Sequence, residues 1–489
     1  MKSIDELIKI TEKGRDLIFS AERYLWQNAE TGYKEWKSTK YLEDEFELLG
    51  YTLVRAKNIP GFYTDFDTGI PGPKVLVMGE LDSLICNEHP DAIPETGAVH
   101  ACGHNAQAAA LLGLAAALKK NALEGAVGSV RLCAVPAEEL IETGYRETLR
   151  KQGIIKYFGG KVEFLYRGYF DGVDMALMVH TTGGKPNNLL IGKGCNGCVV
   201  KNIAYKGKAS HAGGDPYNGI NALYAASLGM QAINSIRETF RDGDHTRVHP
   251  IITKGGTAVN AIPSDVTMES YVRGANLEAI KSVNKRVNRA LAGSAAALGA
   301  NVILSDRPGY TPLINDINLK ALAVEAMKAV VPEENVTSND DWDTGCTDMG
   351  DISAVMPAIH PYTTGASGTG HGMDYFISDP ESACVTSAKF QLVLLSRLLE
   401  NNAYEAKKIL ENKSLRFSTK EAYFKEIDEI FSEKSAVTIN ENGTITLEQL
   451  VEKILEIAKL GGNYKRWLGL LKGRFKDSLA DVVLAALPK

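Results

Sequence analysis

Three short, continuous apolar runs constrain the fold of this chain more than any other feature. They cover residues 74–79, 129–135 and 174–179, and helix-like segments such as 105–120 separate them. Apolar runs without polar alternation are typical of strands that are buried on both faces, as in parallel sheets. Strands that alternate with helices predict the α/β class, with a mostly parallel sheet and helices on both of its faces.

The segment 195–305 has a different order of predicted elements. This order is β-α-β-β-α-β, which is that of ferredoxin-like α+β domains. Alternation of helices and strands resumes after residue 310 and would complete the first sheet, so we expect 195–305 to be a domain inserted into another. The predicted strands are 198–206, 248–253, 264–273 and 301–304, and the predicted helices are 217–240 and 276–297.

The length of the chain also predicts several domains. Its 489 residues exceed what one hydrophobic core usually covers. We expect a catalytic domain in two parts, 1–194 and 306–400, an inserted lid or dimerisation domain, 195–305, and a helical C-terminal extension, 401–489. The extension is rich in lysine and glutamate. A cap on the main domain and an oligomer contact are both open interpretations of it.

Charge and composition exclude several classes of protein. The formal net charge is −6, and acidic and basic residues are mixed, which argues against a surface for nucleic acid or for anionic membranes. The chain has no apolar stretch of about 18 residues, and the N-terminus is amphipathic and charged, unlike the long apolar core of a secretory signal. Its seven cysteines are scattered, as in reduced proteins. We therefore expect a cytoplasmic protein that acts on a small molecule, with neither nucleic acid nor membrane as a partner.

Side chains that can bind metal ions or transfer protons follow the ends of the predicted strands. Open α/β sheets bind ligands at the carboxyl ends of their strands, so these groups are expected to meet. Cys, His and Glu bind divalent transition metals, and a second carboxylate can take a proton from metal-bound water. The sequence therefore predicts a hydrolytic site with two metal ions. The side chains concerned are Glu80, Asp82, Cys102, His104, Glu138 and Glu139.

Some candidates also have a purely structural interpretation. Cys102 and His104 could be a buried thiol beside a capping histidine, although the nearby acidic residues favour metal binding. His180, which closes the third apolar run, is either a ligand or a core residue with satisfied hydrogen bonds. His371 lies in a glycine-rich loop, where exposed histidines are ordinary but functional residues are also common.

Six motifs of the chain resemble those of one enzyme family. They are GELDSL, HACGHN, AVPAEE, YKGKASHAGGDPYNGINAL, GGTAVNAIP and CTDMGDISAVMPAIHPY. The family is that of the di-metal amidohydrolases and metallopeptidases, which includes aminoacylases, glutamate carboxypeptidase and hippurate hydrolase. Within it, the chain most resembles the β-alanyl-lysine dipeptidases and the p-aminobenzoyl-glutamate hydrolase subunit. One departure is that Asn105 and Gln107 stand where the commoner branch has Asp and His.

The resemblance implies a role for each candidate in the metal site. Cys102 would bridge two divalent ions, which would be zinc or manganese, with cobalt as a further option. Glu138 would be the general base, and Asp82 would orient a ligand. Glu80 stands where other branches carry a metal-binding histidine, and whether it is a ligand is left open. The other implied ligands are His104, Glu139, His180 and His371.

The resemblance also implies roles outside the metal ligands. His211 would polarise the carbonyl oxygen of the substrate in the neighbouring subunit, which implies a homodimer formed through the lid domain. Asn260 and Arg273 would hold the other end of the substrate, since an arginine can bind a carboxylate by two parallel hydrogen bonds. An exposed strand arginine is the alternative interpretation of Arg273. His360 is expected among the residues that form the substrate pocket.

Together these inferences predict a metal-dependent amidohydrolase. It would cleave the amide bond of a small N-acyl amino acid or dipeptide with metal-activated water, and Glu138 would act as the base. A p-aminobenzoyl-glutamate-type aryl amide hydrolase is one alternative. The other is a non-catalytic binding or regulatory subunit that retains the metal.

Overall fold

The structure, a computed structural model, describes residues 2–438, 444–446, 451–452, 454–456 and 468–469. These residues form two compact units. The first contains residues up to 197 and residues 309–425, and the second contains residues 198–308 and the described residues from 426 onward. Residues 198–308 are therefore inserted within the sequence of the first unit.

A six-stranded sheet forms the centre of the first unit. In spatial order its strands are β1 (Val54–Arg55), β2 (Phe62–Asp67), β6 (Ser129–Val135), β3 (Lys74–Glu80), β7 (Met175–Leu177) and β18 (Ala358–Ile359). β3 pairs in parallel with β6 and β7, and β7 with β18. Only β1 and β2 run antiparallel to their neighbours within this sheet. The mostly parallel sheet predicted from the apolar runs is thus confirmed.

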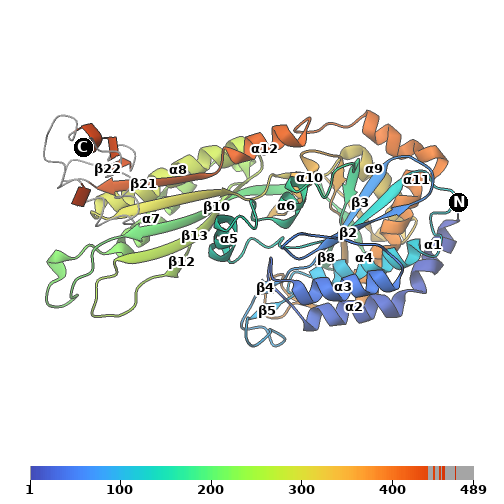
Figure 1. Ribbon diagram of the computed structural model, residues 1–489, viewed down its shortest axis with the longest axis horizontal. Helices are drawn as coiled ribbons and strands as arrows, with labels where there is room; N and C mark the ends of the chain where they lie inside the picture. Colours follow the sequence, from blue (N-terminus) through green and yellow to red (C-terminus); the bar gives the residue numbers. More distant parts are fainter. Residues whose placement is uncertain (1, 439–443, 447–450, 453, 457–467, 470–489) are drawn as a thin grey trace. The chain divides into compact units, whose positions relative to one another are not determined.

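Helices cover both faces of this sheet. α4 (His104–Leu118) packs against β3, and α2 (Arg15–Gln27) and α11 (Ser387–Glu411) pack on α4 (Figure 1). Every residue of α4 is buried, which explains why the helix is apolar on all sides. α6 (Gly160–Tyr166) contacts β6, and β3 is buried on both of its faces. The carboxyl ends of β3 and β6 thus lie beside the starts of α4 and α6.

A second sheet of the first unit positions two histidines. Its strands are β16 (Val336–Ser338), β9 (Leu189–Ile191), β19 (Tyr362–Ser367), β20 (Phe376–Ile377) and β8 (His180–Gly183). β8 pairs in parallel with β19, and His180 lies opposite Tyr362. Because His360 comes just before β19, its ring lies 5.6 Å from that of His180. Further elements of this unit are β4 (Leu84–Ile85), β5 (Ala98–Val99), β15 (Leu313–Ile314), β17 (Trp342–Cys346), α1 (Ile4–Glu12), α3 (Trp36–Leu48), α5 (Thr143–Lys151), α9 (Ile317–Lys328) and α10 (Met349–Ser353).

The second unit has its own sheet and core. Its elements are β10 (Gly194–Lys206), α7 (Ala222–Arg237), β11 (Arg247–Val248), β12 (Ile251–Lys254), β13 (Asp265–Gly274), α8 (Leu277–Ala297) and β14 (Asn301–Pro308). β13 lies between β10 and the short strands β11 and β12, and β14 pairs antiparallel with β10. α7 and α8 pack on each other and on the sheet. The predicted ferredoxin-like order of elements is confirmed.

The C-terminal segment 401–489 corrects one prediction, because it is not purely helical. α11 and α12 (Lys420–Asp428) are helices, but β21 (Ser432–Thr438) pairs antiparallel with β14, and β22 (Thr444–Thr446) pairs with β21. The lysine and glutamate content of the segment suggested a helix. Residues 432–438 form a strand instead, because they pair with the free edge of β14. Most residues beyond 438 lie outside the described part of the chain. Among the described helices, none combines the length and hydrophobicity that crossing a membrane requires.

Candidate metal centre

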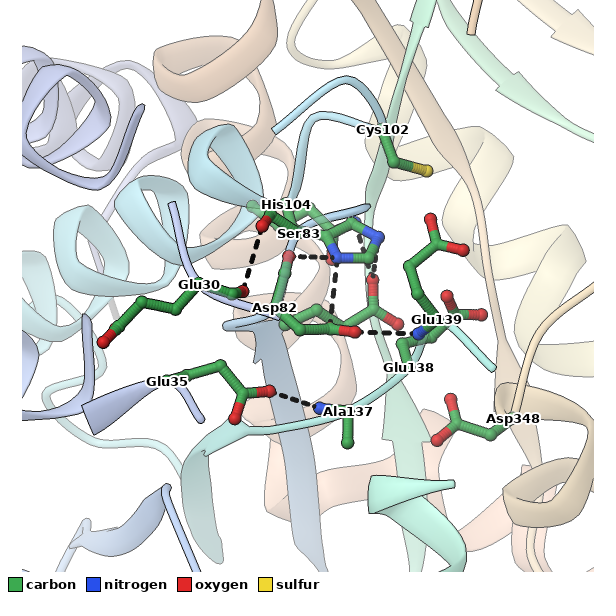
Figure 2. A network of polar contacts seen from close by, with 12 residues as sticks. Glu30, Glu35, Asp82, Ser83, Cys102, His104, Ala137, Glu138, Glu139 and Asp348 are labelled. Atoms are coloured by element: carbon green, nitrogen blue, oxygen red, sulfur yellow. Dashed lines mark hydrogen bonds and ion pairs between the residues drawn. The ribbon is translucent and has the colours of Figure 1, made fainter. Parts of the chain in front are cut away.

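The predicted metal-binding side chains meet in one place in the first unit. Cys102 and His104 each belong to two of three overlapping groups of possible donor atoms, so the groups form a single cluster. Figure 2 shows Cys102, His104, Glu138 and Glu139 gathered where the loops after the strands meet the start of α4. Within each group the donor atoms lie within 4.8 Å of one another, and the groups are Cys102–His104–His180, Cys102–Glu139–His371 and Glu80–His104–Glu138.

A left-handed glycine allows Cys102 and His104 to share the site. Gly103 has a φ of 84° and is the residue just before α4. Glycine adopts this conformation without the steric cost that a Cβ atom brings. A Cβ atom there would also lie 2.4 Å from the hydroxyl oxygen of Tyr375. The sharp turn brings two side chains on either side of Gly103 to the same cluster.

Asp82 fixes the orientation of His104. The Nδ1 atom of His104 donates to the backbone carbonyl oxygen of Asp82 at 2.9 Å, and it also lies 3.3 Å from Asp82 Oδ1. With the proton on Nδ1, the Nε2 atom is left with its lone pair toward the cluster. Asp82 Oδ2 in turn accepts a hydrogen bond from the backbone N–H of Glu139 at 2.8 Å (Figure 2).

The loop after β6 presents the two adjacent glutamates. Its backbone is held at three points: Glu35 accepts a hydrogen bond from the N–H of Ala137 at 2.7 Å, the Tyr310 hydroxyl donates to the carbonyl of Glu138, and Arg146 donates to the carbonyl of Glu139. The carboxylates of the two glutamates therefore stay available to the cluster. Burial and the negative charges of Glu80 and Glu139 raise the pKa of Glu138 well above its ordinary value.

His371 lies on the more open side of the cluster. Its Nε2 atom is 3.2 Å from Glu139 Oε1, and its side chain is 57% exposed. Its backbone N–H donates to the carbonyl of Ala101 at 2.8 Å, which ties the glycine-rich loop to the turn that carries Cys102. Hydrogen bonds to Cys102 and Glu139 raise the pKa of His371 to about 11. Burial opposes the ionisation of Glu139, but His371 lowers its pKa to about 2.

Cys102 is poised to be a thiolate. Its Sγ atom lies 3.5 Å from His180 Nε2. Burial and the charge of Glu139 would raise the pKa of the thiol, but His180 and His104 outweigh them and lower it to about 6. The thiolate is the form of cysteine that binds metal.

The donor set fits divalent metal ions. His104 Nε2 and Glu139 Oε1 are both buried, and each lies 3.2 Å from another group of the cluster, Glu80 Oε2 and His371 Nε2 respectively. Buried charges are costly unless they are paired or bind a metal, and this cluster gathers several acidic groups. It combines the thiolate of Cys102 and the carboxylates of Glu80, Glu138, Glu139 and Asp348 with the ammonium group of Lys161.

His360 lies next to the cluster, beside His180, and its role in the substrate pocket stays a prediction. Its side chain is buried, and its ring is 5.1 Å from that of Tyr362. Burial and the nearby His180 lower the pKa of His360 to about 3, so the ring is neutral. Neither ring nitrogen makes a hydrogen bond within the described part of the chain.

The other predicted substrate-binding residues lie in the second unit. His211 is exposed, and its Nδ1 atom accepts hydrogen bonds from the N–H groups of Gly213 and Gly214. The backbone carbonyl of Asn260 accepts a hydrogen bond from Ala212 at 2.9 Å. The Arg273 guanidinium is 5.4 Å from the ring centre of Tyr271. Their roles toward the substrate stay predictions.

The two amides that replace Asp and His of the commoner branch both bind carboxylates. Asn105 Nδ2 donates to Glu22 Oε1 at 2.7 Å, and Gln107 Nε2 donates to Glu80 Oε2 at 2.8 Å. Both amides are buried at the start of α4. Gln107 therefore takes part in holding Glu80 at the edge of the cluster.

Lys161, like its partner Asp348, belongs to this cluster but was missed by the sequence analysis. Its side chain is completely buried, and its Nζ atom forms ion pairs with Glu80 and Asp348. The signal that could have revealed it is the glycine pair before it. A Cβ atom on Gly160 would lie 1.6 Å from the carbonyl oxygen of Pro136, so only glycine lets α6 start this close to the end of β6.

An α/β sheet whose strand ends gather a thiolate, histidines and paired carboxylates defines a metal-dependent hydrolase. The comparison with known proteins makes this specific. The chain belongs to peptidase family M20/M25/M40, whose family model matches residues 76–397. The protein is thus a di-metal hydrolase that acts on amide bonds, as its motifs predicted.

Relatives of this chain agree with that assignment. It is 29% identical over 367 residues to the Xaa-Arg dipeptidase of Mus musculus, which covers 72% of this chain and 77% of the relative. It is 25% identical to one of the subunits of the p-aminobenzoyl-glutamate hydrolase of Escherichia coli, over 56% of this chain and 70% of the relative. The fold is similar to that of a dinuclear metal-binding M20 peptidase of Bacillus subtilis, with a TM-score of 0.58, 21% identity, and coverage of 80% of this chain and 99% of that one.

Proposed function

We propose that the enzyme cleaves the amide bond of a small dipeptide or N-acyl amino acid at two divalent ions held by Cys102, His104, Glu139, His180 and His371. The observation that supports this most is the meeting of these five side chains in one cluster, although they come from four separate stretches of the chain. The thiolate favours zinc among the possible ions, with manganese or cobalt as alternatives.

Glu138 is the residue suited to move the proton. Bound divalent ions would supply a Lewis acid that lowers the pKa of water and polarises the substrate carbonyl. Glu138 would take a proton from the attacking water and return it to the leaving amine. Its raised pKa makes it a stronger base than an ordinary carboxylate, which favours taking the proton from water. Asp82 keeps His104 and the backbone of Glu139 in place for this chemistry.

The inserted domain would complete the substrate site. His211 from the partner copy would donate a hydrogen bond to the carbonyl oxygen as negative charge develops on it. Asn260 and Arg273 would hold the far end of the substrate, and His360 would border the pocket. We also propose that the enzyme is a cytoplasmic homodimer, on the grounds of its sequence.

A dipeptide is the favoured substrate. The Xaa-Arg dipeptidase relative matches 72% of this chain, whereas the p-aminobenzoyl-glutamate hydrolase relative matches 56% of it. The aryl amide substrate is therefore the second candidate.

The test is a screen of the purified protein by liquid chromatography and mass spectrometry. The metal-free protein is loaded separately with Zn²⁺ and Mn²⁺ and incubated with mixed dipeptides, N-acyl amino acids and p-aminobenzoyl-glutamate. We expect metal-dependent cleavage of a dipeptide that Glu138→Gln abolishes. Cleavage of p-aminobenzoyl-glutamate alone would replace the proposed substrate class, and equal cleavage by Glu138→Gln would reject the assigned base.

A further inference from the structure

A fully buried lysine lies behind the metal cluster, and the proposed mechanism gives it no task. The Lys161 side chain is 0% exposed, as is that of Asp348, and Glu80 is 1% exposed. The Nζ atom of Lys161 pairs with Glu80 Oε1 and lies 2.5 Å from Asp348 Oδ1. The backbone N–H of Lys161 also donates to Asp348 Oδ2 at 2.9 Å. Asp348 therefore binds both the side chain and the backbone of Lys161.

The two oxygens of Glu80 have different neighbours. Oε1 is bound by Lys161, whereas Oε2 accepts a hydrogen bond from Gln107 at 2.8 Å and lies 3.2 Å from His104 Nε2. The Nε2 atom of His104 is the one left open for a metal, because Asp82 binds Nδ1. Only the Oε2 atom of Glu80 therefore lies near the nitrogen of His104 that would bind a metal ion.

The position of Glu80 depends on groups from three elements. Glu80 ends β3, Gln107 lies in the first turns of α4, and Lys161 lies at the start of α6. Without the lysine, the Oε1 atom would be a buried acceptor without a partner, and the carboxylate could turn. The ammonium group therefore helps to fix the orientation of Glu80.

We infer that Lys161 is a positioning residue of the metal centre, which holds one oxygen of Glu80 so that the other faces His104 and strengthens the binding of the ion on the His104 side. This inference rests on the proposed metal centre. Groups that orient metal ligands change metal affinity by about ten- to a hundred-fold when they are removed. The inference also assigns Glu80 a role in binding the ion on the His104 side, a role that the sequence left open.

The chain offers a matched control in a second buried lysine. Lys201 lies in the other unit and is also 0% exposed. Its Nζ atom pairs with Asp306 and lies 2.8 Å from Asn284 Oδ1 and 2.5 Å from Asn288 Oδ1. Lys201→Met removes a buried ammonium from an aspartate, as Lys161→Met does, but not beside the metal cluster. A general effect of losing a buried ion pair would appear in both variants.

The experiment measures Zn²⁺ binding to the full-length, metal-free protein by competition with a chromophoric chelator, without any substrate. We expect two zinc sites in the wild type, and in Lys161→Met we expect one of them to be weakened by about ten- to a hundred-fold. Lys161→Arg, which keeps the cation, should recover part of the loss. Lys201→Met should bind zinc as the wild type does. If Lys161→Met does not fold, Glu80→Gln replaces it and is expected to weaken the same site.

The outcomes separate this inference from the proposed function. Two unchanged zinc sites in Lys161→Met or in Glu80→Gln would overturn the inference and leave the proposed metal centre standing. Tighter zinc binding in Lys161→Met would also overturn it, because the lysine would then act only as a repelling charge. An equal loss in Lys201→Met would mark a general stability effect and reject a positioning role. A wild type that binds no zinc would reject both proposals.

Discussion

The backbone N–H of Glu139 donates to Asp82 Oδ2 at 2.8 Å, while the backbone carbonyl of the same Asp82 accepts a hydrogen bond from His104. One residue just after β3 therefore connects two predicted metal ligands, one from the loop after β6 and one from α4. Because Asp82 is completely buried, the geometry it imposes is not relaxed by solvent. The metal centre consequently depends on a residue that we do not expect to bind the metal itself.

Replacing Asp82 tests this connection. Asp82→Ala removes the acceptor for the Glu139 N–H but keeps the backbone carbonyl that binds His104. We expect catalytic efficiency and metal affinity to fall by about ten- to a hundred-fold, because a ligand loses its support. Asp82→Asn, which keeps an oxygen acceptor, should lose less. The measurements are steady-state kinetics and zinc competition, and an Asp82→Ala enzyme with wild-type values in both would contradict the prediction.

Glu138→Gln tests the proton transfer separately from metal binding. The amide has nearly the shape of the carboxylate but cannot accept the proton from water. We expect kcat to fall by about a hundred- to ten-thousand-fold, the usual contribution of a general base. The melting temperature and the zinc content measured by mass spectrometry should stay close to those of the wild type. A loss of zinc together with activity would instead identify Glu138 as a ligand.

The thiol of Cys102 should react selectively in the metal-free enzyme. Its pKa is lowered to about 6, so at pH 7.5 most of it is thiolate, whereas burial raises the pKa of Cys195 to about 12. The rate of alkylation by iodoacetamide should rise as the pH passes 6 and then level off. Peptide mapping locates the label, and Cys102→Ser is the control. Prior loading with Zn²⁺ should protect the thiol, and equal labelling with and without zinc would exclude Cys102 as a ligand.

Asp351 should make stability depend on pH. Burial raises its pKa to about 7, while hydrogen bonds from Thr311 and Tyr423 only partly oppose the shift. The folded state therefore holds a proton that the unfolded state has already lost above about pH 4. The free energy of unfolding should decrease as the pH rises from 4 to 7, by an amount on the order of a few kcal/mol. Denaturant titrations at several pH values measure this decrease, and Asp351→Asn should flatten it. An identical pH dependence in the variant would show that other groups are responsible.

The sequence by itself determined the parallel sheet and the chemical nature of the site. Burial of a strand on both faces leaves a continuous apolar run, which is a local pattern that can be read without knowing the partner strand. The donors of the cluster follow the ends of those runs, where α/β sheets place their ligands. Cys102, His104, Glu138 and Glu139 could therefore be grouped before the strand order was known.

Tertiary structure alone decided which distant groups pair. Lys161 reaches Glu80 across 81 residues, and the glycine pair before Lys161 indicates a close approach but does not identify Glu80 as the partner. Their contact follows from the pairing of β3 with β6 and from the close start of α6, which Gly160 permits. In the same way, β21 is a strand because β14 offers it an unpaired edge, although the lysine- and glutamate-rich segment around it was expected to be helical. Local propensity fixes what a segment can become, whereas long-range hydrogen bonds and ion pairs form only where the fold has brought their partners together.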